Sequence, residues 1–174
     1  MDEVIARVVV GVSGSVGSLA ALRRAVAEAR ARRAVLWSVL VWDAGDDRTV
    51  RRDPVAEVFR VWEADALVRL HAAWEQAVGA VPTDPATRLF IAPGRPGPTL
   101  TRIADRADDL LVVGSGTGGP FRRLRGGSVA AQCAAHARCC VLAVPPPAWE
   151  RDLGRGPVSR LLARRRLVQE LTRP

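Results

Sequence analysis

A stretch rich in glycine and arginine, GSGTGGPFRRLRGGS, runs from Gly114 to Ser128. It follows an apolar run typical of a buried strand and precedes VAAQCAAHA, which is typical of a helix. Glycines let the main chain approach an anion closely, and a serine at a helix N-terminus adds a hydroxyl beside amides that lack partners within the helix. The stretch therefore indicates an anion-binding loop, with a flexible connection that binds nothing as the alternative.

Two common nucleotide-binding motifs do not explain this loop. A Walker loop ends in Gly-Lys-Ser/Thr, whereas residues 126–128 read GGS and the chain contains no lysine. Residues 114–119 do match G-x-G-x-x-G, but the dinucleotide fingerprint needs an acidic residue about 20 positions later. None occurs between Asp109 and Glu150. We therefore expect an anion to be held by main-chain amides at the start of the following helix.

Side chains that could support catalysis or bind a metal are scattered along the chain. No Ser-His-Asp or Cys-His arrangement can be recognised, so we expect the protein not to be an enzyme. Cys133, His136 and Cys139 recur every three residues, but a zinc site needs four ligands and the other histidine, His71, is far away in sequence. We expect no metal site, and we interpret Cys133, Cys139 and Cys140 as small buried side chains.

Apolar runs and amphipathic segments alternate before the proline run at residues 145–147. Strands are expected near residues 8–12, 34–44, 86–94, 109–115 and 139–144, and helices near 15–33, 55–78, 96–108 and 128–137. Strands that are apolar on both faces and alternate with helices indicate a parallel sheet covered on both faces. The expected fold is therefore α/β, a doubly wound five-stranded parallel sheet that binds ligands beyond the carboxyl ends of its strands.

Positive charge is concentrated at the carboxyl end of the chain. The formal net charge is +8, and all 26 basic residues are arginine. Residues 151–174 hold seven arginines against Asp152 and Glu170, a net charge of +5. We divide the chain into a domain over 1–147 and a basic extension over 148–174, helical or disordered. No recognition motif accompanies the charge, so a nucleic-acid partner is not expected.

The sequence gives no sign of membrane insertion or export. No apolar run approaches the roughly 18–20 residues that a membrane-spanning helix needs. Acidic residues precede the first apolar run, at a place where a signal peptide would carry bases. We therefore expect a cytoplasmic protein with no membrane partner.

Several segments resemble the universal stress protein family. VVVGVSGSVGSLAALRRAVAEA and the continuous segment from APGRPGP to CCVLAVP stand in the family's order, and the resemblance covers about residues 5–146. Members that bind ATP resemble G-x-x-G-x(9)-G-S/T, which Gly114, Gly127 and Ser128 match. The resemblance implies an adenine nucleotide alpha hydrolase-like sheet with strand order 3-2-1-4-5. It also implies a homodimer that pairs along the fifth strand, whose open apolar edge a soluble protein must cover.

The resemblance also implies a regulatory protein of the stress response that binds ATP, with or without Mg²⁺. In this chain two positions depart from the family's pattern: Thr117 stands at its middle glycine, and Ser13 replaces the aspartate of D-x-S. The alternative is a family member that binds no nucleotide and acts on an unidentified protein as a homodimeric module through its basic tail. The candidate site residues are Val12, Ser13, Ser15, Val41, Val113, Gly114, Gly116, Thr117, Gly118, Gly127, Ser128 and Val129.

Overall fold

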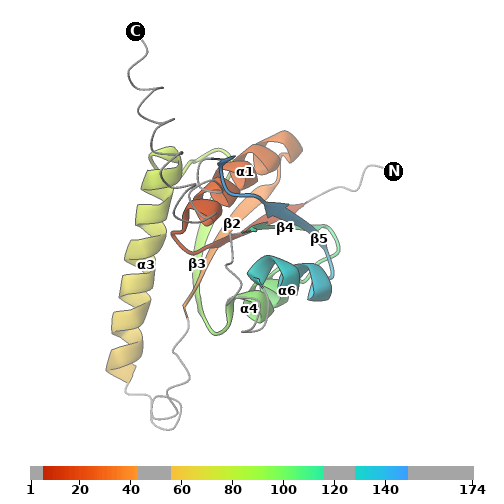
Figure 1. The fold of residues 1–174 in the computed structure, drawn as a ribbon. Helices are drawn as coiled ribbons and strands as arrows, with labels where there is room; N and C mark the ends of the chain where they lie inside the picture. Colours follow the sequence, from red (N-terminus) through yellow and green to blue (C-terminus); the bar gives the residue numbers. More distant parts are fainter. Residues whose placement is uncertain (1–5, 43–55, 116–127, 149–174) are drawn as a thin grey trace, which may run out of the picture.

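The structure, a computed structural model, describes residues 6–42, 56–115 and 128–148 (Figure 1). Its elements along the chain are β1 (Arg7–Val12), α1 (Val16–Arg32), β2 (Val35–Trp42), α3 (Ala56–Val78), β3 (Thr87–Pro93), α4 (Pro96–Ile103), β4 (Asp109–Gly114), α6 (Val129–His136) and β5 (Cys140–Val144). Each strand and helix that the sequence predicts is present. The helix after β3 ends earlier than expected, because the chain turns after Ile103 to bring Asp105 and Asp109 to one arginine.

The five strands form one parallel sheet in the order β3-β2-β1-β4-β5. The predicted fold class and strand order are thus confirmed. Helices α1 and α3 cover one face of the sheet, and α4 and α6 cover the other (Figure 1). From β1 the chain adds β2 and β3 on one side, and it then adds β4 and β5 on the other side. The carboxyl ends of β1 and β4, between which the winding reverses, therefore form the switch point of the fold.

Alternate residues of β1 supply the two halves of the core. Val8, Val10 and Val12 pack with α1 and α3, whereas Val9 packs with α4 and α6. All four are buried, because helices lie on both faces of the sheet. This explains why the strand reads as an uninterrupted apolar run rather than as an alternating one.

The amino ends of β1 and β4 are joined by a buried ion pair. Arg7 donates from Nε to Asp109 Oδ1 at 2.7 Å and from Nη2 to Asp109 Oδ2 at 2.6 Å. The same Nη2 also donates to Asp105 Oδ1 at 3.0 Å, and the guanidinium lies 4.2 Å from the centre of the Trp37 ring. The hydrogen bond from Arg7 holds the pKa of Asp105 below its usual value. Polar groups at this end of the sheet therefore satisfy one another.

Candidate functional site

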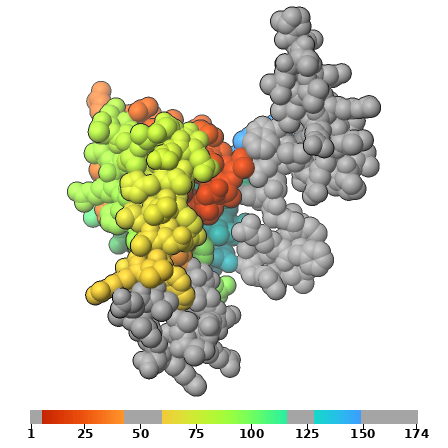
Figure 2. All heavy atoms as spheres, turned by 90° about the vertical axis from the view of Figure 1, so that its left-hand side faces the viewer, coloured from red at the N-terminus to blue at the C-terminus, as the bar shows by residue number. Residues whose placement is uncertain are grey.

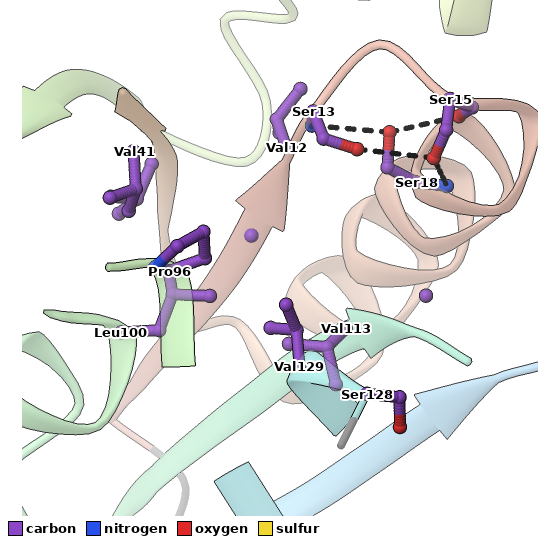
Figure 3. Close-up of a pocket in the computed structure, with 13 residues that line it drawn as sticks. Val12, Ser13, Ser15, Ser18, Val41, Pro96, Leu100, Val113, Ser128 and Val129 are labelled. Atoms are coloured by element: carbon purple, nitrogen blue, oxygen red, sulfur yellow. Dashed lines mark hydrogen bonds between the residues drawn. The ribbon is translucent and has the colours of Figure 1, made fainter. Parts of the chain in front are cut away.

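A cavity of about 150 Å³ opens at the carboxyl ends of β1, β2 and β4 (Figure 3). It lies at the switch point of the sheet, where doubly wound folds bind their ligands. Its walls come from β1, β2, β4 and the first turns of α1, α4 and α6. The lining residues are Gly11, Val12, Ser13, Ser15, Ser18, Val39, Val41, Pro96, Leu100, Val113, Gly114, Ser128 and Val129.

One side of the cavity is apolar. Val41 faces Pro96 and Leu100, while Val113 and Val129 lie together across the cavity from them (Figure 3). Val41, Leu100, Val113 and Val129 belong to the core cluster between the sheet and the pair α4 and α6 or pack against it, so the core holds them in place. An apolar cavity of about 150 Å³ is large enough for one flat aromatic ring. This side is therefore suited to a ring rather than to a charged group.

The opposite side is a turn of serines between β1 and α1. Gly14 has φ +75°, a conformation that a residue with a Cβ rarely adopts. Ser18 Oγ donates to the Ser15 carbonyl at 2.9 Å and accepts from the Ser13 amide at 3.2 Å. The hydroxyls of Ser13 and Ser15 lie 3.1 Å apart and are exposed (Figure 3). The buried hydroxyl of Ser18 thus fixes the turn, and the hydrogen-bonded pair of Ser13 and Ser15 hydroxyls keeps one O–H at the surface that can donate to a ligand.

Three helices begin at the cavity, and none has an acidic side chain in its first turn. Ser15 caps α1 by accepting from the Ser18 amide, and Ser128 caps α6 by accepting from the Ala131 amide at 3.1 Å. The capping role expected for Ser128 is thereby confirmed. At the starts of α1 and α6, first-turn amides and the helix dipole favour negative charge, and no carboxylate within these turns offsets that preference. The start of α4 offers fewer donors, because Pro96 and Pro98 have no N–H. The cavity therefore combines an apolar wall with an edge that favours an anion.

Gly114 has a packing role that the sequence did not indicate. A Cβ at this position would lie 2.6 Å from the carbonyl oxygen of Gly17 and 3.0 Å from the Ser18 amide. Because these are main-chain atoms of α1, a larger residue would displace the helix start that forms the cavity wall. Gly114 is thus required to seat α1 against β4, whatever ligand the cavity takes.

Eight of the predicted site residues line this one cavity: Val12, Ser13, Ser15, Val41, Val113, Gly114, Ser128 and Val129. The other four, Gly116, Thr117, Gly118 and Gly127, lie outside the described residues. The sequence-based prediction missed Gly11, Ser18, Val39, Pro96 and Leu100. For the residues of α4 a signal was present, because the loop after the third strand of a parallel sheet reaches the same edge as the loops that were considered.

The expectation of buried cysteines is only partly correct. Cys133 is buried, but Cys139 is half-buried and Cys140 is exposed, because β5 is an edge strand. Burial, with a smaller contribution from Cys139, raises the pKa of the Cys133 thiol to about 11. Within residues 6–42, 56–115 and 128–148, no three histidine, cysteine or acidic side chains come together where they could hold a metal ion. None of the helices in these ranges is both long and apolar enough to cross a membrane.

Comparison with known proteins gives a consistent result. The model of the universal stress protein family matches residues 5–145. The chain is 31% identical to a universal stress protein crystallised in complex with cAMP, covering 79% of this chain and 94% of that chain with a TM-score of 0.50. It is 24% identical to the universal stress protein UspA from Lactobacillus plantarum (80% and 97% covered, TM-score 0.61). It is 22% identical to a universal stress protein from Archaeoglobus fulgidus (79% and 97% covered, TM-score 0.51). No match is found among the curated proteins.

Proposed function

The chain belongs to the universal stress protein family, and from this premise we propose that it is a cytoplasmic, nucleotide-gated regulator of the stress response that binds ATP. One observation carries the proposal: an apolar wall and the starts of α1 and α6, which have no first-turn acids, meet in a single cavity. Adenine needs an apolar slot and phosphate needs donors, so the two halves of the cavity suit the two halves of a nucleotide. A relative of 31% identity was crystallised with cAMP, which supports an adenine nucleotide.

The geometry suggests how the ligand would lie. The adenine ring packs between Val41 and Leu100 on one side and Val129 on the other. The phosphates point toward Ser128 and the serine turn, where hydroxyls and first-turn amides can donate hydrogen bonds. Mg²⁺, where it accompanies ATP, would neutralise part of the phosphate charge. The described residues that line the cavity carry no charged side chain, so in this proposal donors and helix dipoles do the main work of binding.

Gating follows from where the phosphates sit. Gly114 and Ser128 both line the cavity, and residues 115–127 connect them along the chain. A ligand that contacts both ends of this segment binds one arrangement of it more tightly than others and so shifts the population toward that arrangement. We expect a partner to distinguish the two populations. We also expect binding without dedicated catalysis, and this stays a prediction.

Two substitutions of Ser128 test the placement of the phosphates. Asparagine and aspartate both cap helices well, so Ser128→Asn and Ser128→Asp should leave the start of α6 intact. Only the aspartate adds negative charge beside the proposed phosphate. Calorimetric titration with ATP should show Ser128→Asn near wild-type affinity and Ser128→Asp weaker by at least about tenfold, or about 1.4 kcal/mol. Equal affinity of the two variants would place the phosphates elsewhere.

A second function, a homodimeric interaction module that uses no nucleotide, is favoured by β5. Among the described strands β5 pairs with β4 alone, so its outer edge offers main-chain donors and acceptors to a second chain. In this reading two chains pair along β5, and the basic tail contacts an unidentified protein. Ala143 is an exposed residue of β5, and Ala143→Arg would place like charges across a two-fold axis. Light scattering should show a dimer for wild type and a monomer for the variant; a monomeric wild type would overturn this pairing.

A further inference from the structure

Helix α3 has two apolar faces, of which the domain covers one. The inner face packs into the core through Ala66, Leu70 and Trp74, all of which are buried. On the outer face Val61 is 62% exposed and Val68 is 67% exposed. Figure 2 looks onto this side of the molecule and shows α3, in yellow, at its front with no described segment over it. Among the residues whose burial the structure describes, five large apolar residues are exposed, and four of them belong to this helix: Val61, Leu67, Val68 and Val78.

The outer face has the spacing of a helix-pairing seam. Exposed residues recur there at alternating steps of three and four: Val61, Ala64, Val68, His71, Glu75 and Val78. This heptad spacing is the one with which one helix packs lengthwise on another. Glu75 lies within the seam and forms no ion pair with another described residue. The seam therefore suits an amphipathic helix that brings positive charge.

We propose that residues 157–174 of the same chain dock as a helix on this outer face of α3. Leu161, Val168 and Leu171 follow each other at steps of seven and three, the same steps that separate Val61, Val68 and His71. Between the apolar positions lie Arg164, Arg165 and Arg166, which bring positive charge to Glu75.

The charges of the tail and of α3 are opposite in sign, and a helix over residues 157–174 is short enough to lie along α3. The sequence of α3 has four acidic residues against two arginines, a net −2, whereas residues 151–174 carry a net +5. The described chain ends at Ala148, and residues 149–156 can span up to about 27 Å. A helix over residues 157–174 would be about 27 Å long, and α3 is about 35 Å long. Docking within one chain also benefits from a high effective concentration. The proposal is independent of nucleotide binding.

Hydrogen exchange of the full chain tests this docking. Amides of residues 158–171 should exchange at least tenfold more slowly than in an unstructured peptide, at a rate that does not change with protein concentration. The double substitution Val61→Asp/Val68→Asp on α3 should abolish this protection. Val168→Asp in the tail should do the same without changing any residue of the described core. The control Ala134→Asp, at an exposed position of α6, should leave the protection unchanged.

Two results would overturn the proposal. If the tail amides exchange as fast as in an unstructured peptide, the tail does not dock. If protection grows with protein concentration, the occupant of the seam is a second copy of the chain.

Discussion

The two ends of the strand pair β1 and β4 show opposite uses of polar groups. At the amino end Arg7 and Asp109 face each other in register and satisfy one another in a buried, bidentate ion pair. At the carboxyl end the same two strands run into Ser13 and Gly114, beside a cavity with exposed hydroxyls and helix N-termini. At the amino end the polar groups are paired with one another, whereas at the carboxyl end hydrogen-bond donors remain available to a ligand.

This difference separates stability from function along the same strands. Removing one member of a buried ion pair leaves an uncompensated charge, so mutations at the amino end should lower the free energy of unfolding. The serine turn and the start of α6 lie at the surface, so mutations at the carboxyl end should change the affinity for the ligand. Variants placed at the two ends can test whether this separation holds.

The largest effect is expected from Asp109→Ala, which removes the buried partner of Arg7. Among the described residues, the guanidinium would then keep the exposed carboxylate of Asp105, the Ile103 carbonyl and the Trp37 ring as partners. We expect the free energy of unfolding to fall by about 3–5 kcal/mol in urea titrations. Asp105→Ala, a carboxylate on the same arginine with a side chain 65% exposed, is the matched control and should cost much less. Similar losses of stability for both variants would contradict the interpretation that the buried Arg7–Asp109 pair stabilises the amino end.

A smaller effect is expected from two thiols near the amino end, the buried thiol of Cys133 and the half-buried thiol of Cys139. The pKa of Cys133 is raised from an ordinary value near 9 to about 11, mainly by burial, and burial also raises the pKa of Cys139. Between these values the unfolded chain loses a proton that the folded chain keeps, so stability is full below about pH 9 and falls as pH rises toward 11. For Cys133 the loss should be roughly 2 kcal/mol.

The chain contains neither lysine nor tyrosine, so neither residue type titrates between about pH 9 and 11 and obscures the contribution of the thiols. Urea unfolding at pH 8.5 to 11 should show a shallower decline for Cys133→Ala than for wild type. Cys140→Ala, which removes an exposed thiol from the edge strand, is the control and should keep the wild-type decline. An unchanged decline in Cys133→Ala would show that this thiol is not the cause.

The smallest effect is expected from a pair of substitutions at the two ends of one strand, β2. Val35 and Val41 lie on the same face of β2, near the amino end and at the cavity respectively. Val41→Trp should fill part of the cavity and weaken ATP binding by about tenfold or more, or about 1.4 kcal/mol. Val35→Trp, at a position 37% exposed, should leave the affinity unchanged. If both variants bind ATP as wild type does, the apolar wall does not contact the ligand.

Much of the fold could be predicted because its signals are local. The run Val8–Val10 identifies a strand buried on both faces, and the serine at position 128 identifies the start of a helix. The carboxyl edge of the sheet followed from the alternation of strands and helices. The family resemblance supplied much of the list of candidate residues at that edge, eight of which line one cavity.

What the sequence could not give depends on contacts between distant segments. Arg7 and Asp109 are 102 positions apart, and nothing local marks either as buried. The reason for Gly114 is its contact with the main chain of Gly17, which exists only after α1 packs on β4. Leu100 lines the cavity because α4 folds back over the sheet. Each of these is a property of the assembled layers rather than of a motif.

The central claim is that the cavity at the carboxyl ends of β1, β2 and β4 binds an adenine nucleotide. Isothermal titration calorimetry of the dialysed full chain with ATP tests it most directly. We predict a saturable heat of binding with one site per chain. Absence of both a binding heat and a thermal shift at millimolar ATP would contradict the claim and favour the nucleotide-free module.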